Sequence, residues 1–232
     1  MNTILDNVKA VQDAVAQAAL RSGRQPEDVT LVAASKMNDT PRLREAYDAG
    51  IRVFGENRVQ ELVEKNAQGA YEGAGLHFIG HLQTNKVKFV AGVCDLIQSV
   101  DSEALVRQIG RRAAALGKVQ DILIEVNIGR EPGKSGVLTE ELEALLGIAS
   151  GEPGVHVRGL MAIPPVTENP ALSRKFFDAM RQLYVDTAAK KYDNIDMCVL
   201  SMGMSADYAE AICAGATMVR VGTAIFGSRH YV

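Results

Sequence analysis

The chain alternates between short apolar runs and longer amphipathic segments, and this alternation constrains its fold more than any other feature. Residues 29–34 form a short, nearly continuous apolar run, as expected of a strand buried on both faces in a parallel sheet. Short candidate strands follow at residues 51–54, 76–79, 96–100, 122–126, 155–161, 197–200 and 218–221. Alternation of strands and helices implies parallel strands joined by right-handed crossovers. Eight units of roughly 29 residues favour a closed (β/α)8 barrel (a TIM barrel) over an open doubly wound sheet.

Amphipathic patterns predict the helices of the outer ring. They lie near residues 57–70, 83–91, 102–116, 139–150, 170–190 and 205–214, and a further helix has Thr40 as its cap, Pro41 in its first turn and Gly50 just past its end. The first helix begins at a cap residue, Thr3, and ends at Gly23, and we expect it to fill the eighth outer position. Because no linker or shift in composition interrupts the pattern, we expect a single barrel domain over residues 1–232.

Composition excludes several classes of partner. A net charge of −3 without a basic cluster argues against nucleic acid, and no apolar stretch is long enough to cross a bilayer. The first residues lack the pattern of a signal peptide. Cys94, Cys198 and Cys213 have apolar neighbours and no metal-ligand spacing, so we interpret them as buried free thiols and expect a cytoplasmic protein.

A barrel of this kind places its site at the carboxyl ends of the strands. Lys36 follows the first strand, where burial lowers the pKa of an amine and suits it to attack a carbonyl, although a lone lysine is more often simply solvated. Asn57 follows the second strand, where it can either cap the next helix or bond a ligand. The position of Asn57 alone favours the role of helix cap.

The loops after the seventh and eighth strands have the composition of a phosphate site. Ser201 and Ser205 follow the seventh strand, and Gly222 and Thr223 follow the eighth. Small residues let backbone N–H groups approach phosphate oxygens, and a helix N-terminus favours negative charge. The alternative to a phosphate site is that Ser205 only caps the following helix and Gly222 only forms a turn. Arg220, within the eighth strand, needs a partner if it faces the barrel mouth, because an unpaired buried charge is costly.

Six segments together resemble the pyridoxal phosphate homeostasis proteins. They are LVAASK at 31–36, FGENRVQE at 54–61, HFIGHLQTNK at 77–86, GLMAIP at 159–164, LSMGMS at 200–205 and MVRVGTAIFG at 218–227. The match keeps the same order over almost the whole chain. These proteins share their barrel with the N-terminal domain of alanine racemase, a fold-type III enzyme.

The resemblance implies a cofactor, pyridoxal 5′-phosphate (PLP), and a role for each candidate residue. Lys36 matches the lysine that holds PLP as a Schiff base, and Arg220 matches the arginine near the pyridine nitrogen. Ser201, Ser205, Gly222 and Thr223 match the stretches that hold the phosphate, and Asn57 lies in the motif that flanks the ring. An arginine beside that nitrogen keeps it unprotonated, which weakens the ring as an electron sink.

The resemblance also implies a carrier rather than an enzyme, one that buffers PLP and passes it to apo-enzymes. The alternative is a fold-type III enzyme, such as a weak racemase or decarboxylase. Racemisation needs a second acid–base group, which in alanine racemase is a tyrosine of a C-terminal β domain that also completes the dimer. We expect that domain to be absent and the protein to be monomeric; His230 and Tyr231 are the tail residues that could replace the tyrosine. A third possibility is a barrel for another phosphorylated metabolite, with Lys36 incidental.

Overall fold

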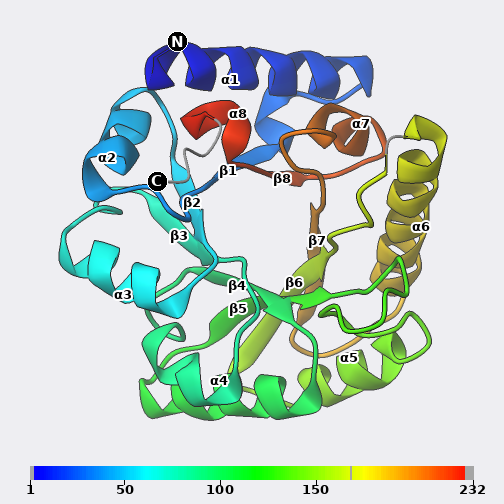
Figure 1. The fold of residues 1–232 in the computed structure, drawn as a ribbon. Coiled ribbons are helices and arrows are strands. Elements are labelled where there is room, and N and C mark those ends of the chain that lie inside the picture. Colours follow the sequence, from blue (N-terminus) through cyan, green and yellow to red (C-terminus); the bar gives the residue numbers. More distant parts are fainter. Residues whose placement is uncertain (1–2, 168, 228–232) are drawn as a thin grey trace.

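The computed structural model describes residues 3–167 and 169–227. Its strands form a closed barrel in which each strand pairs in parallel with the next and β8 pairs with β1 (Figure 1). The strands are β1 (Thr30–Ala34), β2 (Val53–Glu56), β3 (Gly75–Phe78), β4 (Leu96–Val100), β5 (Gln120–Glu125), β6 (Val155–Met161), β7 (Ile195–Ser201) and β8 (Met218–Val221). The predicted (β/α)8 barrel is confirmed.

Strands β4, β6 and β8 coincide with their predicted ranges, but β2 begins and ends two residues later than residues 51–54. Ile51 donates its N–H to the carbonyl of Ala46 and so belongs to the end of the preceding helix. Gly55 and Glu56 instead continue the strand, because they pair with β3. This shift places the Glu56 side chain inside the protein, where it is fully buried.

The helices surround the barrel in the order expected. They are α1 (Ile4–Arg21), α2 (Thr40–Asp48), α3 (Val59–Ala67), α4 (Glu103–Ala115), α5 (Leu142–Ser150), α6 (Pro170–Ala188), α7 (Tyr208–Cys213) and α8 (Thr223–Phe226), with 3₁₀ turns η1 (Pro26–Asp28) and η2 (Thr84–Phe89). Two predictions were wrong in detail. In the helix predicted near residues 83–91, Thr84–Phe89 form the 3₁₀ turn η2 instead of an α-helix. Helix α2 is capped not by Thr40 but by Asp39, whose carboxylate accepts the N–H of Arg42.

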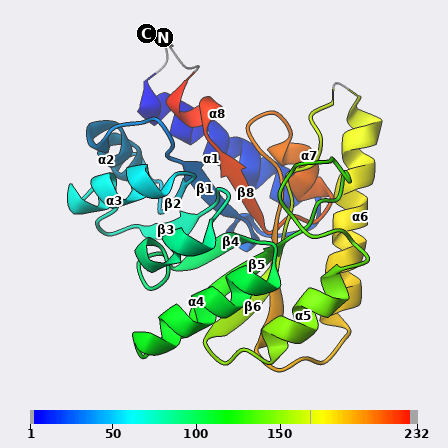
Figure 2. The same cartoon turned by 60° about the horizontal axis from the view of Figure 1, so that its bottom comes forward.

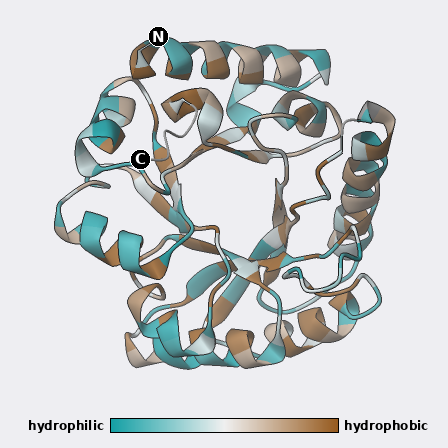
Figure 3. Cartoon of the chain, in the orientation of Figure 1, coloured by the Kyte–Doolittle hydropathy of each residue, from teal (hydrophilic) through white to brown (hydrophobic). Residues whose placement is uncertain are grey.

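Helix α1 fills the outer position that the short α8 leaves open. It is capped by Thr3, as predicted, and buries one face from Ile4 to Ala19. This face packs against α2, α7 and α8 (Figures 1 and 2). The other helices also carry both apolar and polar residues, which appear as brown and teal bands in Figure 3, and apolar residues such as Ile109 on α4 and Leu145 on α5 are buried. The main core therefore lies between the barrel and its ring of helices.

The inside of the barrel has an apolar layer and a polar layer. Five buried side chains form the apolar cluster: Val32, Leu96, Leu123, Met161 and Met218. Side chains two residues apart on a strand share a face, so Gln98 lies above Leu96 and Arg220 lies above Met218. Lys36, four residues after Val32, therefore emerges on the side of the barrel mouth.

The cysteines differ from expectation, because only Cys94 is buried, whereas Cys213 is half-buried and Cys198 is exposed. Cys198 lies near the amino-terminal half of β7, where alternate side chains face away from the core. No helix in the described ranges is long and apolar enough to cross a membrane. Residues 3–167 and 169–227 also contain no group of three His, Cys, Asp or Glu placed to hold a metal ion. His230 and Tyr231 lie outside the described residues.

Candidate functional site

A cleft of about 1110 Å³ opens at the carboxyl ends of β1 and β8. Five of the seven predicted site residues line it: Lys36, Ser205, Arg220, Gly222 and Thr223. The other two, Asn57 and Ser201, lie outside this lining. The cleft thus brings together an amine, a guanidinium, hydroxyl groups and backbone N–H groups from segments almost 190 residues apart in the sequence.

The loops after β7 and β8 are joined through Ser205. Its Oγ accepts the backbone N–H of Gly222 at 3.1 Å and that of Ala224 at 3.3 Å. The loop that carries Ser205 turns at Gly203, where φ is +92° and an added Cβ would lie 2.5 Å from the Cβ of Ala211. Only glycine fits there without a shift of the neighbours. Small residues thus bring two N–H groups and a hydroxyl together at one wall of the cleft, where the hydroxyl oxygen accepts both N–H groups.

Arg220 is held by partners from the neighbouring strands and loops. It is buried, and its guanidinium donates to the Ser201 hydroxyl at 2.5 Å and to the Ala162 carbonyl at 2.9 Å. Burial lowers the pKa of Arg220 to about 10, although Glu125 and Asp207 act in the opposite direction. The guanidinium is therefore a cation at neutral pH, in a fixed orientation.

Ser201 anchors this arginine rather than lining the cleft. Its hydroxyl donates to Gln98 Oε1 at 2.7 Å, and Gln98 Nε2 lies 3.0 Å from His77 Nδ1. Burial lowers the pKa of His77 to about 4, with Asp95 opposing, so the imidazole is neutral at physiological pH. The polar layer thus runs from Arg220 through Ser201 and Gln98 to His77. Sequence reasoning missed Gln98 and His77, which could have been found from the period of two along their strands.

Asn57 lies in a second hollow of about 350 Å³, together with Glu125 and His81. It does not cap α3: the cap residue is Arg58, and the Glu56 carboxylate accepts the N–H groups of both Asn57 and Arg58. The Oδ1 atom of Asn57 is buried and has no hydrogen-bond partner among the described residues. The prediction that Asn57 caps the next helix, which its position alone favoured, was therefore wrong. Its Oδ1 atom remains an acceptor for a ligand.

Glu125, in the same hollow, is a buried acid that sequence reasoning missed. Burial raises its pKa to about 7; the nearby Asp101 raises it further, and Arg220 lowers it. The carboxyl group is therefore partly protonated near neutral pH.

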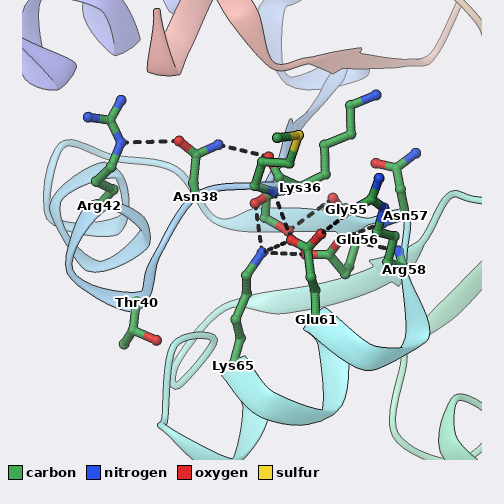
Figure 4. Close-up of polar contacts among 12 residues, drawn as sticks. Lys36, Asn38, Thr40, Arg42, Gly55, Glu56, Asn57, Arg58, Glu61 and Lys65 are labelled. Carbon is green, nitrogen blue, oxygen red and sulfur yellow. Dashed lines mark hydrogen bonds and ion pairs between the residues drawn. The ribbon is translucent and has the colours of Figure 1, made fainter. Parts of the chain in front are cut away.

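The backbone around Lys36 is bonded on both sides (Figure 4). On one side, the Ser35 carbonyl accepts from Lys65 Nζ at 2.9 Å; on the other, the N–H of Met37 donates to Glu61 Oε2 at 2.7 Å. The carbonyl of Lys36 itself accepts from the Asn38 amide at 3.1 Å. The side chain of Lys36 is half-buried and extends away from these backbone contacts (Figure 4).

These contacts depend on a buried ion pair between Glu56 and Lys65. Lys65 Nζ lies 2.8 Å from Glu56 Oε2 and 2.7 Å from Glu61 Oε2. Glu56 also accepts from the Ser35 hydroxyl at 2.8 Å. Burial acts to raise the pKa of Glu61, but the hydrogen bonds from Lys65 and the Met37 N–H outweigh it, and the net pKa is lowered. Glu61 is thus a carboxylate at neutral pH.

The chemistry of the cleft suits a ligand that carries both a carbonyl and a phosphate. A primary amine can bond the carbonyl carbon, and the Ser205 hydroxyl, whose oxygen accepts the N–H groups of Gly222 and Ala224, can donate its own proton to a phosphate oxygen. The fixed guanidinium of Arg220 can donate to a ring nitrogen that carries no proton. Asn57, beside the cleft, offers its unpartnered oxygen.

Comparisons with known proteins agree with this chemistry. Residues 5–230 match the family model of the alanine racemase N-terminal domain. A pyridoxal phosphate homeostasis protein of Aquifex aeolicus is 43% identical over 97% of this chain and 98% of its own length. The chain belongs to this family. The Escherichia coli K12 member is 42% identical over all of this chain and 99% of its own length.

A solved structure of another relative extends the comparison. PipY of Synechococcus elongatus, in a solved structure with PLP bound, matches this chain with a TM-score of 0.81 and 37% sequence identity. The alignment covers 92% of this chain and 99% of PipY. The curated relatives carry the name of homeostasis proteins and not of enzymes.

Proposed function

We propose that this chain binds PLP in the main cleft, holds it as a Schiff base on Lys36, and buffers or delivers it within the cell. The observation that carries the proposal is the meeting of Lys36 with Ser205, Gly222 and Arg220 in one cleft. The PLP-bound PipY structure and the names of the relatives support the choice of ligand.

Each residue has a role that follows from its surroundings. PLP supplies an aldehyde, whose carbon forms a C=N bond with the nitrogen of a primary amine while the aldehyde oxygen leaves as water. Lys36 provides that amine from the barrel mouth. Ser205, Gly222 and Thr223 bind the phosphate. Ser201 acts indirectly, because its hydroxyl orients the Arg220 guanidinium toward the ring nitrogen.

Asn57 completes the proposed site from the second hollow. Its Oδ1 atom is an acceptor to which no donor within residues 3–167 and 169–227 bonds, and a buried acceptor without a donor is costly. A polar group on the cofactor ring would satisfy it. Asn57 is therefore proposed to bind the ring rather than the phosphate.

We further propose that the protein is a cytoplasmic monomer and that apo-enzymes receive the cofactor from it. The free thiols are consistent with a reducing compartment. Arg220 supports a carrier, because a guanidinium at the ring nitrogen disfavours protonation there and limits the use of the ring as an electron sink.

Binding of PLP and of pyridoxine 5′-phosphate, which has no aldehyde, tests the proposal in the wild-type protein. Calorimetry should give tight binding of PLP and weaker binding of the alcohol, since only PLP can bond to Lys36. Equal affinities would overturn the Schiff base while leaving a phosphate site. Absence of binding for both compounds would refute the proposed function altogether.

A further inference from the structure

Two side chains of α3 reach the backbone on both sides of Lys36 without lining the main cleft. Lys65 contacts Ser35, the residue before Lys36, and Glu61 contacts Met37, the residue after it. Figure 4 shows both contacts rising from α3 to the segment that follows β1. The arrangement fixes the peptide units that flank the lysine and leaves its side chain directed away from them.

The ammonium group of Lys65 has all its donors in use. It bonds the carbonyl of Ser35 at 2.9 Å, Glu56 at 2.8 Å and Glu61 at 2.7 Å. An ammonium has three N–H donors, so these contacts saturate it. Only 10% of the Lys65 side chain is exposed, and a saturated, buried ammonium has one stable orientation.

Met37 has a backbone conformation that needs external support. Its φ is +61°, in the left-handed region that a non-glycine residue rarely occupies. Such a conformation persists only where the surroundings hold it. The Asn38 N–H closes the turn by donating to the Ser35 carbonyl at 3.2 Å, and from outside the turn Glu61 Oε2 accepts the N–H of Met37 at 2.7 Å. Loss of this bond would allow the peptide after Lys36 to relax.

The two carboxylate oxygens of Glu61 have different partners. Glu56 and Lys65 form a neutral buried pair at 2.8 Å, and Glu61 Oε1 lies 3.5 Å from Nη1 of Arg58, whose side chain is exposed. Glu61 Oε2 is instead shared between Lys65 and the N–H of Met37. The surface pair with Arg58 does not require that second contact, so the distinctive contribution of Glu61 is the bond to the Lys36 segment.

We propose that Glu61 and Lys65 are positioning residues for Lys36, which hold the Ser35–Met37 backbone so that the lysine amine reaches the aldehyde of PLP. The inference rests on the proposed function. It predicts that weakening this support lowers the affinity for an aldehyde cofactor and leaves the phosphate site intact.

The test compares Glu61→Ala with Glu61→Gln and with Glu64→Ala, an exposed control on the same helix. PLP and pyridoxine 5′-phosphate are titrated into each protein by calorimetry, and the melting temperature of each apo-protein is recorded. We expect Glu61→Ala to bind PLP about tenfold more weakly than wild type, as loss of one hydrogen bond to a charged group implies. Binding of pyridoxine 5′-phosphate should be unchanged. Glu61→Gln, which keeps an acceptor for Met37, should lose about threefold, and Glu64→Ala should lose nothing.

Each other outcome has a distinct meaning. Equal weakening of PLP and pyridoxine 5′-phosphate would overturn the positioning role, because it would show general damage to the barrel. Unchanged PLP binding in Glu61→Ala would overturn it as well. If Glu61→Ala does not fold, the comparison of the two ligands is made on Glu61→Gln with the same criteria. Failure of the wild type itself to discriminate between the ligands would instead refute the proposed Schiff base.

Discussion

Replacing Lys65 with methionine should destabilise the protein severely, because it leaves a buried carboxylate without its cation. Glu56 is fully buried and bonds Lys65 Nζ at 2.8 Å. Breaking a buried ion pair by removal of one partner costs about 3–5 kcal/mol. Methionine retains the apolar stem of the lysine, so the loss reports the charge and its hydrogen bonds rather than a cavity.

The assay is urea unfolding of the apo-protein, followed by far-UV circular dichroism because the chain has no tryptophan. With a slope of roughly 3 kcal/mol per M, the expected loss moves the unfolding midpoint down by roughly 1 to 1.7 M. Lys175→Met, at an exposed position on α6, is the matched control and should be neutral. The double variant Glu56→Gln with Lys65→Met removes the stranded charge and should recover at least half of the loss. A single-variant loss below about 1 kcal/mol, or a double variant that loses the sum of both changes, would refute the reasoning.

Three further predictions concern the hollow, the phosphate wall and the chemistry. In the folded protein the pKa of Glu125 is raised from 4.5 to about 7, so its ionisation lowers the free energy of unfolding as pH rises from about 4.5 to 7. The stability of Glu125→Gln relative to wild type, measured by urea unfolding, should therefore increase by roughly 3 kcal/mol between pH 4.5 and pH 8. The same dependence of stability on pH in both proteins would contradict this prediction. Ser205→Ala should weaken PLP binding about tenfold but leave the binding of pyridoxal, which has no phosphate, unchanged in the same titration. In deuterated water, NMR of amino acids with the holoprotein should show no sustained exchange of the α-proton, and such exchange would favour the enzyme alternative.

The barrel could be predicted from the sequence because strands buried on both faces leave continuous apolar runs, such as Ile122–Ile124 in β5. A boundary was mispredicted where a helix end and a strand start share apolar residues, as at Ile51. That two-residue error at β2 placed Glu56 in a loop, when in fact it is buried in the strand. The sequence therefore could not reveal the ion pair beneath Lys36, which depends on the true end of β2.

The main cleft was predictable to the extent that its residues follow the strands directly. Lys36, Gly222 and Ser205 do so, and the structure brings them together. Lys65 was not identified, because a lysine on an amphipathic helix is usually solvated. The sequence signal for its burial was its position one turn after Leu62, on the buried face of α3. Ser201 was assigned by resemblance to the phosphate, whereas its hydroxyl contacts Arg220 and Gln98; only three-dimensional contacts distinguish these positions.

The central claim is that Lys36 holds PLP covalently, and the most direct measurement is the visible absorption spectrum of wild type and Lys36→Ala with added PLP, before and after borohydride. We expect the band of a protein-bound Schiff base in the wild type alone, with peptide mass spectrometry locating the reduced label on Lys36. A band of equal strength in Lys36→Ala, or a label on another lysine, would contradict the claim.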